Sequence, residues 1–135
     1  MSGTGYGRPV PLRWDQPFWD AAGESRLVGQ RCRDCDRVQL YPKPACARCG
    51  ASAFEWIELS GSGTVWSHAY VRQAVDEAMR DQVPFMLLDV ELDEGPHLLS
   101  RLLGDAHDLA IGERVMVRFV EIAGSDRPLP FFARV

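Results

Sequence analysis

The sequence of 135 residues contains no apolar run close to the roughly 20 residues that a bilayer-spanning helix needs. Its N-terminus, Met1 to Val10, is polar and glycine-rich, without the apolar segment of a secretory signal. These absences favour a soluble cytoplasmic protein that uses no membrane as a partner. In that compartment the cysteines are expected to be reduced thiols.

Motifs of independent catalysis are also missing. There is no GxSxG nucleophile motif and no paired-carboxylate signature. His68, His97 and His107 lack metal-ligand spacing to one another. The acids around one predicted strand end are interpreted as a solvated rim: Asp89, Glu91, Asp93 and Glu94. Catalysis by this chain alone is therefore the weaker hypothesis.

Positive charge is scarce except in one segment. The net charge is -4, so the overall field repels polyanions and makes a nucleic-acid partner unlikely unless a local patch binds it. Residues 26–48 have a net charge of +4, whereas residues 49–135 have -7. The asymmetry indicates two surfaces with different partners. The basic side chains are Arg26, Arg31, Arg33, Arg37, Lys43 and Arg48.

Turn and cap residues divide the chain into a flexible tail (1–14), a short helix with a linker (15–30), a cysteine-bearing segment (31–53), interpreted below as a zinc ribbon, and a β barrel (54–135), whose strand count suits an OB-fold but also allows other small barrels. Asp15 as a cap, Pro17 in the first turn and Gly23 at the end predict the helix, with Phe18 and Trp19 as its apolar bulk. Short strands at 27–31 and 38–41 are expected to form a hairpin beside the first cysteine pair.

The rest of the chain has a β pattern, typical of a small antiparallel barrel. Strands are predicted at 54–59, 64–72, 85–92, 98–103, 114–120 and 131–135, with turns at 61–63, 93–96, 111–113 and 124–126. Alternation puts Met86, Leu88, Val90 and Leu92 on one face, and likewise Val115, Val117 and Phe119. Simple alternation also predicts that Trp66, His68 and Tyr70 share a face, which either packs the barrel or contacts a partner.

The four cysteines form two CxxC pairs, Cys32 with Cys35 and Cys46 with Cys49, separated by ten residues. Two such turns bring four thiolates onto one ion, and four thiolates fill a tetrahedral zinc shell. Two disulfides, a redox dithiol and an iron centre are the competing interpretations. A closed four-sulfur shell predicts a structural metal that holds a small module together.

Several short segments, in their order and spacing, resemble the bacterial and archaeal family of zinc-ribbon plus OB-fold proteins that accompany thiolase-fold enzymes of acyl-CoA metabolism. The resemblance covers approximately residues 17–135. It is carried by Pro17-Phe18-Trp19, Gln30-Arg31-Cys32, Pro42-Lys43-Pro44, Trp56, Gly61-Ser62-Gly63-Thr64-Val65, Val83-Pro84-Phe85, Leu92-Asp93-Glu94-Gly95-Pro96 and Ile111-Gly112-Glu113-Arg114-Val115.

The resemblance implies a mainly β protein with a short helix, a rubredoxin-like zinc ribbon and an OB-fold barrel. It also implies a non-catalytic subunit that binds a thiolase-fold enzyme and helps hold or channel acyl-CoA. Family partners include thiolases, ketosynthase-like or acyltransferase enzymes, and lipid-transfer-type retro-aldolases of sterol side-chain degradation. Because arginine donates paired hydrogen bonds to phosphates, the ligand candidates are Arg33, Arg37, Lys43 and Arg48. A plain solubilising role on exposed knuckle loops is the competing interpretation for each of them.

Two other hypotheses stand beside the accessory subunit. An OB-fold with a zinc ribbon suits a nucleic-acid-binding module, although the acidic barrel argues against a groove that tracks a polyanionic strand. A self-sufficient enzyme would need catalytic groups that the sequence does not present in a recognisable pattern. The accessory subunit ranks first.

Overall fold

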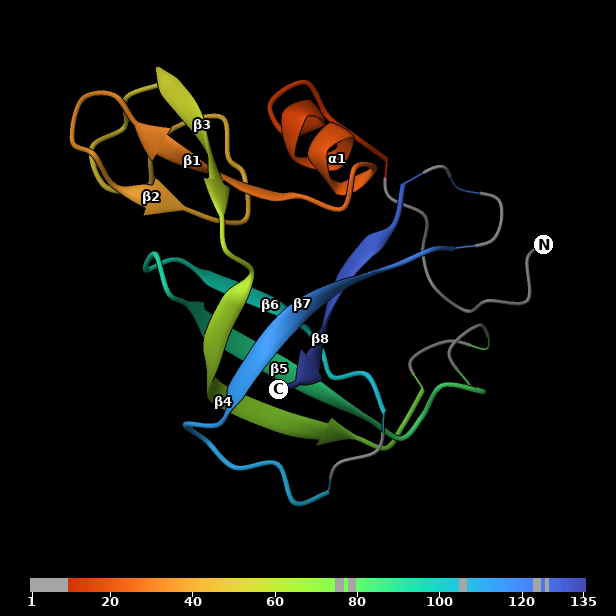
Figure 1. The fold of residues 1–135 in the computed structure, drawn as a ribbon. Helices are drawn as coiled ribbons and strands as arrows, with labels where there is room; N and C mark the ends of the chain where they lie inside the picture. Colours follow the sequence, from red (N-terminus) through yellow and green to blue (C-terminus); the bar gives the residue numbers. More distant parts are fainter. Residues whose placement is uncertain (1–9, 75–76, 78–79, 105–106, 123–124, 126) are drawn as a thin grey trace.

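The computed structural model describes residues 10–135 except 75–76, 78–79, 105–106, 123–124 and 126. Most of the predicted tail, and Gly124 and Asp126 of one predicted turn, lie outside the described residues. Within the described part of the chain, no helix is long and apolar enough to cross a membrane. The elements are α1 (Gln16–Ala22), β1 (Leu27–Cys32), β2 (Val38–Gln39), β3 (Phe54–Leu59), β4 (Ser62–Val71), β5 (Phe85–Leu92), β6 (His97–Arg101), β7 (Arg114–Val120) and β8 (Leu129–Arg134) (Figure 1).

The ribbon is a three-stranded antiparallel sheet in the order β2-β1-β3. β1 and β2 form the predicted hairpin, with Gln30 opposite Gln39. β3 has the predicted bounds, but it was expected to begin the barrel. Instead it pairs with β1 along its whole length, from Leu59 opposite Leu27 to Phe54 opposite Cys32. The hydrogen bonds of β3 therefore belong to the ribbon sheet, and the chain leaves it only at Leu59.

The second sheet has five antiparallel strands in the order β6-β5-β4-β7-β8. It curls so that its two edge strands approach each other below the ribbon and α1 (Figure 1). Just beyond β6, Leu102 forms a bridge with Phe132 of β8, and the Leu103 N–H donates to the Phe132 carbonyl at 2.7 Å. Closing the edges in this way protects otherwise unpaired backbone groups. The predicted mainly β fold, with a short helix, a zinc ribbon and an OB-like barrel, is confirmed.

Strand alternation located the barrel interior correctly. Met86, Leu88, Val90 and Leu92 are all buried. On β7, Val115 is buried, and Val117 and Phe119 are half-buried against the same core. Both strands also have the predicted bounds. A two-residue period was sufficient here because one face of each strand packs inward.

The predicted strand 64–72 is present as β4, but the predicted shared face of Trp66, His68 and Tyr70 was wrong because the strand contains a β-bulge. Val65 pairs with Val90 and Ser67 with Asp89, which leaves Trp66 between them as the extra residue. Beyond the bulge, Tyr70 lies opposite buried Met86 and packs against the core. Trp66 instead lies on the outer face, 56% exposed. Trp66 therefore does not share a face with His68 and Tyr70.

The helix α1 fixes the ribbon to the barrel. Phe18 and Trp19 are buried, and they join one apolar cluster with Leu27 and Leu40 of the ribbon and Phe132 of the barrel. The helix occupies the predicted range, but the Asp15 side chain makes no cap hydrogen bond. Its two carboxylate oxygens accept from the Leu12 N–H at 2.6 Å and the Tyr41 hydroxyl at 2.9 Å. Asp15 thus connects the helix to the ribbon.

Two glycines at the start of β4, Gly61 just before it and Gly63 within it, allow close approach of strands. The predicted turn is present at Gly61, which has a φ of 82°. Gly63 is buried where β4 meets β5, and a Cβ atom there would lie 2.6 Å from Val90 Cγ1 and 2.7 Å from the Glu91 carbonyl oxygen. The segment therefore combines the predicted turn with close packing of β4 against β5.

We predict that Gly63→Ala destabilises the barrel by about 1–3 kcal/mol, because the added methyl group overpacks a site bounded partly by backbone. Chemical denaturation measures the change in the free energy of unfolding. Ser67→Ala, an exposed position on the same strand, is the control and should alter that free energy by less than about 0.5 kcal/mol. Equal stability of the two variants would contradict the packing argument.

Candidate functional site

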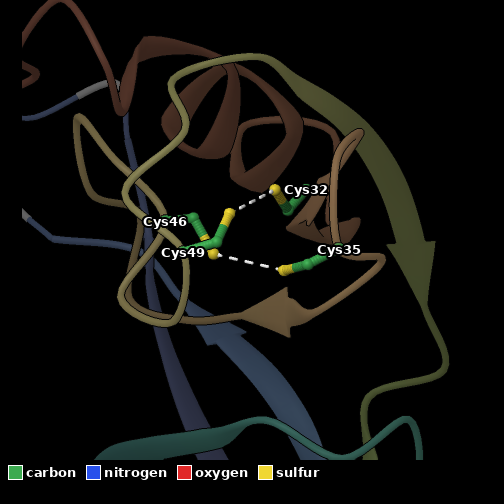
Figure 2. Close-up of side chains that lie close together, drawn as sticks. All are labelled: Cys32, Cys35, Cys46 and Cys49. Carbon is green, nitrogen blue, oxygen red and sulfur yellow. Dashed lines mark hydrogen bonds between the residues drawn. The ribbon is translucent and has the colours of Figure 1, made fainter.

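The four cysteines converge at the tip of the ribbon (Figure 2). Cys32 and Cys49 place their Sγ atoms 3.6 Å apart, as do Cys35 and Cys46. All four Sγ atoms lie within 4.8 Å of one another, and all four cysteines are free thiols. Each close contact joins one knuckle to the other, so the cluster crosslinks the two turns.

The two knuckles have the same backbone geometry. In the first, the Asp36 N–H donates to the Cys32 carbonyl, and in the second, the Gly50 N–H donates to the Cys46 carbonyl, both at 2.9 Å. Asp36 and Gly50 occupy equivalent positions and both have positive φ, 66° and 81°. This left-handed residue closes each turn after its second cysteine. The repeated CxxC spacing therefore produces two matching ligand turns.

The sulfur geometry fits one tetrahedral metal ion. With a Zn–S distance of about 2.3 Å, a tetrahedron has S–S edges of about 3.8 Å, close to the observed separations. A disulfide would require about 2.05 Å. Four thiolate donors suit zinc or iron, and they leave no coordination position for a substrate. Four cysteines positioned to bind one metal ion are thus confirmed.

Without a bound cation, the thiols of Cys46 and Cys49 differ in pKa. Backbone hydrogen bonding from Cys49, with a smaller contribution from Arg48, lowers the pKa of the Cys46 thiol to about 6 against the opposing effect of burial. For Cys49, a backbone hydrogen bond from Ala51 lowers the pKa, but the adjacent sulfurs and burial together raise it to about 12. Crowded thiolates repel one another, and a bound dication removes that repulsion.

Two buried glutamines, absent from the sequence-based candidates, position the segment between the knuckles. The Gln39 amide donates to Gln30 Oε1 at 2.8 Å, and the Ala47 N–H donates to Gln39 Oε1 at 3.0 Å. Gln30 also exchanges two 2.9 Å hydrogen bonds with the Lys43 backbone. The sequence hinted at this pair only through the predicted hairpin, which places Gln30 opposite Gln39. Two opposite glutamines give no pattern that distinguishes a buried pair from an exposed one.

The predicted ligand residues Arg33, Arg37, Lys43 and Arg48 are all exposed. By contrast, Arg26 and Arg31 are paired with Glu58 and Glu55 across the ribbon sheet. Within the described part of the chain, none of the four candidates forms an ion pair with a carboxylate. The positive charge of the segment 26–48 is therefore concentrated on the four residues selected from the sequence.

The structure brings two of these candidates together. Arg37 and Lys43 line a cleft of about 350 Å³ between the ribbon and the β5–β6 turn of the barrel, opposite His97. We call this hollow the basic cleft. Arg33 and Arg48 are outside its lining; the Arg33 guanidinium donates to the Phe54 carbonyl at 3.3 Å.

The acids predicted as a solvated rim have defined partners. His97 Nδ1 lies 2.8 Å from Asp89 Oδ1, and His97 Nε2 lies 3.7 Å from Glu91 Oε2. Both ring nitrogens therefore face carboxylates. Asp93 forms a bidentate pair with Arg114. This pairing lowers the pKa of Asp93. The Ser60 N–H donates to Glu94 at 2.8 Å. These acids connect turns and strands.

A second hollow, of about 400 Å³, lies where α1 faces the seam between β6 and β8. We call it the apolar cavity. Phe18 and Trp19 form its helical wall, and Leu87, Leu99 and Phe131 are on the barrel side. The apolar bulk of the helix is evident in the sequence, but a cavity between residues so far apart in the chain has no signature there.

Comparison with known proteins identifies the family. Residues 19–55 match the family described as ChsH2, rubredoxin-like zinc ribbon domain, and residues 56–120 match ChsH2, C-terminal OB-fold domain. A DUF35 domain-containing scaffold protein of Methanocaldococcus jannaschii is 31% identical over 98 residues, which cover 71% of this chain and 69% of that protein. The chain belongs to the ChsH2/DUF35 family. The junction between the two matched domains falls within β3.

Other proteins similar to this chain differ in size. A solved structure of an Ltp2-ChsH2(DUF35) aldolase is similar with a TM-score of 0.80 and 31% identity, covering 94% of this chain and 98% of that one. A Thermomonospora curvata protein named probable enoyl-CoA hydratase alpha subunit is 35% identical over 128 residues. The match covers 93% of this chain, which spans only 39% of that protein.

We predict that Cys46→Ser removes the metal and lowers the midpoint of thermal unfolding, because a structural metal supplies folding free energy to a small module. Elemental analysis should find one zinc ion per wild-type chain and less than half of that in the variant. Ala47→Ser, an exposed position in the same knuckle, is the control. A folded wild-type protein without zinc or iron would refute the metal assignment.

We predict that Gln39→Leu destabilises the protein by about 1–3 kcal/mol, because it removes the acceptor of the Ala47 N–H and one of the two hydrogen bonds that Gln30 Oε1 accepts, around a side chain that is itself buried. The free energy of unfolding of the metal-loaded protein measures the loss. Gln73→Leu, at an exposed position, provides the comparison. If both variants lose the same stability, the amide network is not what holds the knuckle.

Proposed function

We propose that this chain is a non-catalytic accessory subunit that binds a thiolase-fold enzyme and helps hold the acyl-CoA substrate of that enzyme. The single observation that carries the proposal is its likeness, at 31% identity, to nearly the whole of one chain of a solved Ltp2-ChsH2(DUF35) aldolase. Relatives named as scaffold proteins and as hydratase alpha subunits support a role in an assembly. In this proposal the partner performs the chemistry, and a structural zinc ion holds the ribbon.

The basic cleft is the proposed site for the CoA phosphates. Arg37 and Lys43 face a hollow large enough for a phosphate-bearing group, and no carboxylate among the described residues neutralises them. Paired guanidinium donors and a lysine ammonium recognise phosphates through charge-assisted hydrogen bonds. The metal knuckle and the Gln30 amide hold the backbone at these two residues, so little order is lost on binding.

Arg33 and Arg48 are proposed as additional phosphate contacts, one on each knuckle. They lie close in sequence to Cys32 and Cys49, so the metal limits the movement of their backbone. Their position outside the basic cleft makes their effect on affinity smaller than that of Arg37 and Lys43. Single alanine variants at each of the four residues would distinguish the contribution of Arg37 and Lys43 to CoA affinity from that of Arg33 and Arg48.

We predict that Arg37→Ala and Lys43→Ala each weaken CoA binding about tenfold, because each removes a charge-assisted contact. Isothermal titration with CoA at low salt measures the Kd. Arg118→Ala, which removes an exposed arginine on β7 away from the cleft, should leave the Kd unchanged. If the Arg118 variant weakens binding as much as the cleft variants, net charge and not the cleft governs affinity.

Two further measurements distinguish the functional classes. Co-expression with a thiolase-fold enzyme of the same organism should give one peak with both chains on size exclusion, and separate elution would count against the subunit role. Titration with a single-stranded oligonucleotide at two salt concentrations tests the nucleic-acid hypothesis. Steeply salt-dependent oligonucleotide binding without any response to CoA would replace the proposed function.

A further inference from the structure

The apolar cavity has the size and lining of a small-molecule site. Its volume, about 400 Å³, falls within the range of roughly 300–1,000 Å³ that is typical of ligand pockets. Aromatic and aliphatic side chains make up most of its wall, and Tyr41, Ser100 and Arg101 are the polar exceptions. A few polar groups around an apolar hollow are the usual arrangement for binding an apolar group in a fixed orientation.

The helical wall of the cavity is fixed before any ligand binds. Trp19 donates to the Tyr41 hydroxyl at 2.7 Å, and that hydroxyl donates to Asp15 at 2.9 Å. The Phe18 ring packs edge-on against both aromatic rings, with centroids 5.0 and 5.1 Å away. A pre-organised wall does not have to lose conformational entropy on binding.

The opposite wall is also held in place. The Arg101 guanidinium lies 3.8 Å from the centroid of the Phe85 ring and 5.3 Å from that of Phe131, which joins β5, β6 and β8 across the seam. Ser100 further connects the seam by donating to the Pro130 carbonyl at 2.5 Å. At the mouth, Leu99 is 71% and Leu87 40% exposed. The cavity therefore presents apolar side chains to water that a ligand could cover.

The cavity and the basic cleft are neighbours along the same two segments. In the chain after β2, Leu40 and Lys43 line the cleft, whereas Tyr41 lines the cavity. On β6, His97 lines the cleft and Leu98 the cavity. The proposed phosphate site thus lies within reach of an apolar hollow for one ligand that has a polyanionic head and an apolar tail.

We propose that the apolar cavity binds the acyl chain of the thioester whose CoA phosphates occupy the basic cleft. This inference rests on the proposed function and extends it, because it assigns the acyl group to this subunit as well as the CoA head. The cavity selects for apolar chains several carbons long, since a two-carbon acyl group would cover little of its wall. Binding therefore strengthens with chain length until the cavity is filled.

The test titrates the zinc-loaded full chain, alone and in complex with its partner, with CoA, acetyl-CoA and octanoyl-CoA. Each methylene buried in an apolar site tightens binding about fourfold. We expect octanoyl-CoA to bind at least about tenfold more tightly than acetyl-CoA, with a change in Trp19 fluorescence. Leu99→Asp should abolish the chain-length effect and leave CoA binding intact. Ile111→Asp, which alters another exposed apolar residue outside the cavity lining, should preserve both.

The outcomes separate the two proposals. If CoA and octanoyl-CoA bind equally, the cavity does not hold the acyl chain, although the accessory role stands. If Leu99→Asp disrupts the complex with the partner and chain length has no effect, the cavity face is a protein interface and the inference fails. If CoA does not bind but decanoate still changes Trp19 fluorescence in a Leu99-dependent way, the cavity site stands and the proposed CoA role fails.

Discussion

The crosslinking of two knuckles by four sulfurs is the constraint on which the ribbon depends. Its sheet is small, and β2 contains only two residues, so apolar burial alone provides little stability for this module. A metal bound tetrahedrally by the four sulfurs would supply the missing constraint and fix the relative positions of both CxxC turns. The same constraint would fix the backbone of the basic loops, because Arg33, Arg37 and Arg48 lie on or directly beside the CxxC turns. A metal held by these four sulfurs would thus organise the charge of the ribbon, with no coordination position left for a substrate.

The ribbon and the barrel are joined through a shared core. The buried cluster runs from Phe18 and Trp19 on α1, through Leu27 and Leu40, to Phe132 in the barrel. Consequently the relative placement of the two parts is set by packing, and the hollows between them have defined walls. Both the basic cleft and the apolar cavity lie at this junction. The junction between two small modules is a common place for a ligand site, because each module contributes one wall.

Local patterns predicted the features that have a local cause. CxxC spacing identifies the ligand turns because the turn geometry is set within five residues, from Cys32 to Asp36 in the first knuckle. Alternation identified the interior of β5 and β7 because a strand that packs on one side must repeat every two residues. The same rule failed at Trp66, where one extra residue reversed the face. A bulge depends on the register of the neighbouring strand, and alternation within β4 carries no information about that register.

The basic cleft and the apolar cavity could not be predicted from the sequence, because each depends on contacts between segments far apart in the chain. Arg37 and Lys43 could be selected from the sequence because positive charge is concentrated near the cysteines, but their meeting with His97 depends on how the ribbon packs on the barrel. Gln30 and Gln39 were missed because glutamine is usually exposed, and only burial reveals that their amides replace water as the partners of the knuckle backbone. These glutamines link the two levels. They hold the segment that presents Lys43 to the basic cleft, and the same segment carries Tyr41 into the wall of the apolar cavity. The geometry of both hollows is therefore coupled to the glutamine hydrogen bonds beside the four cysteines.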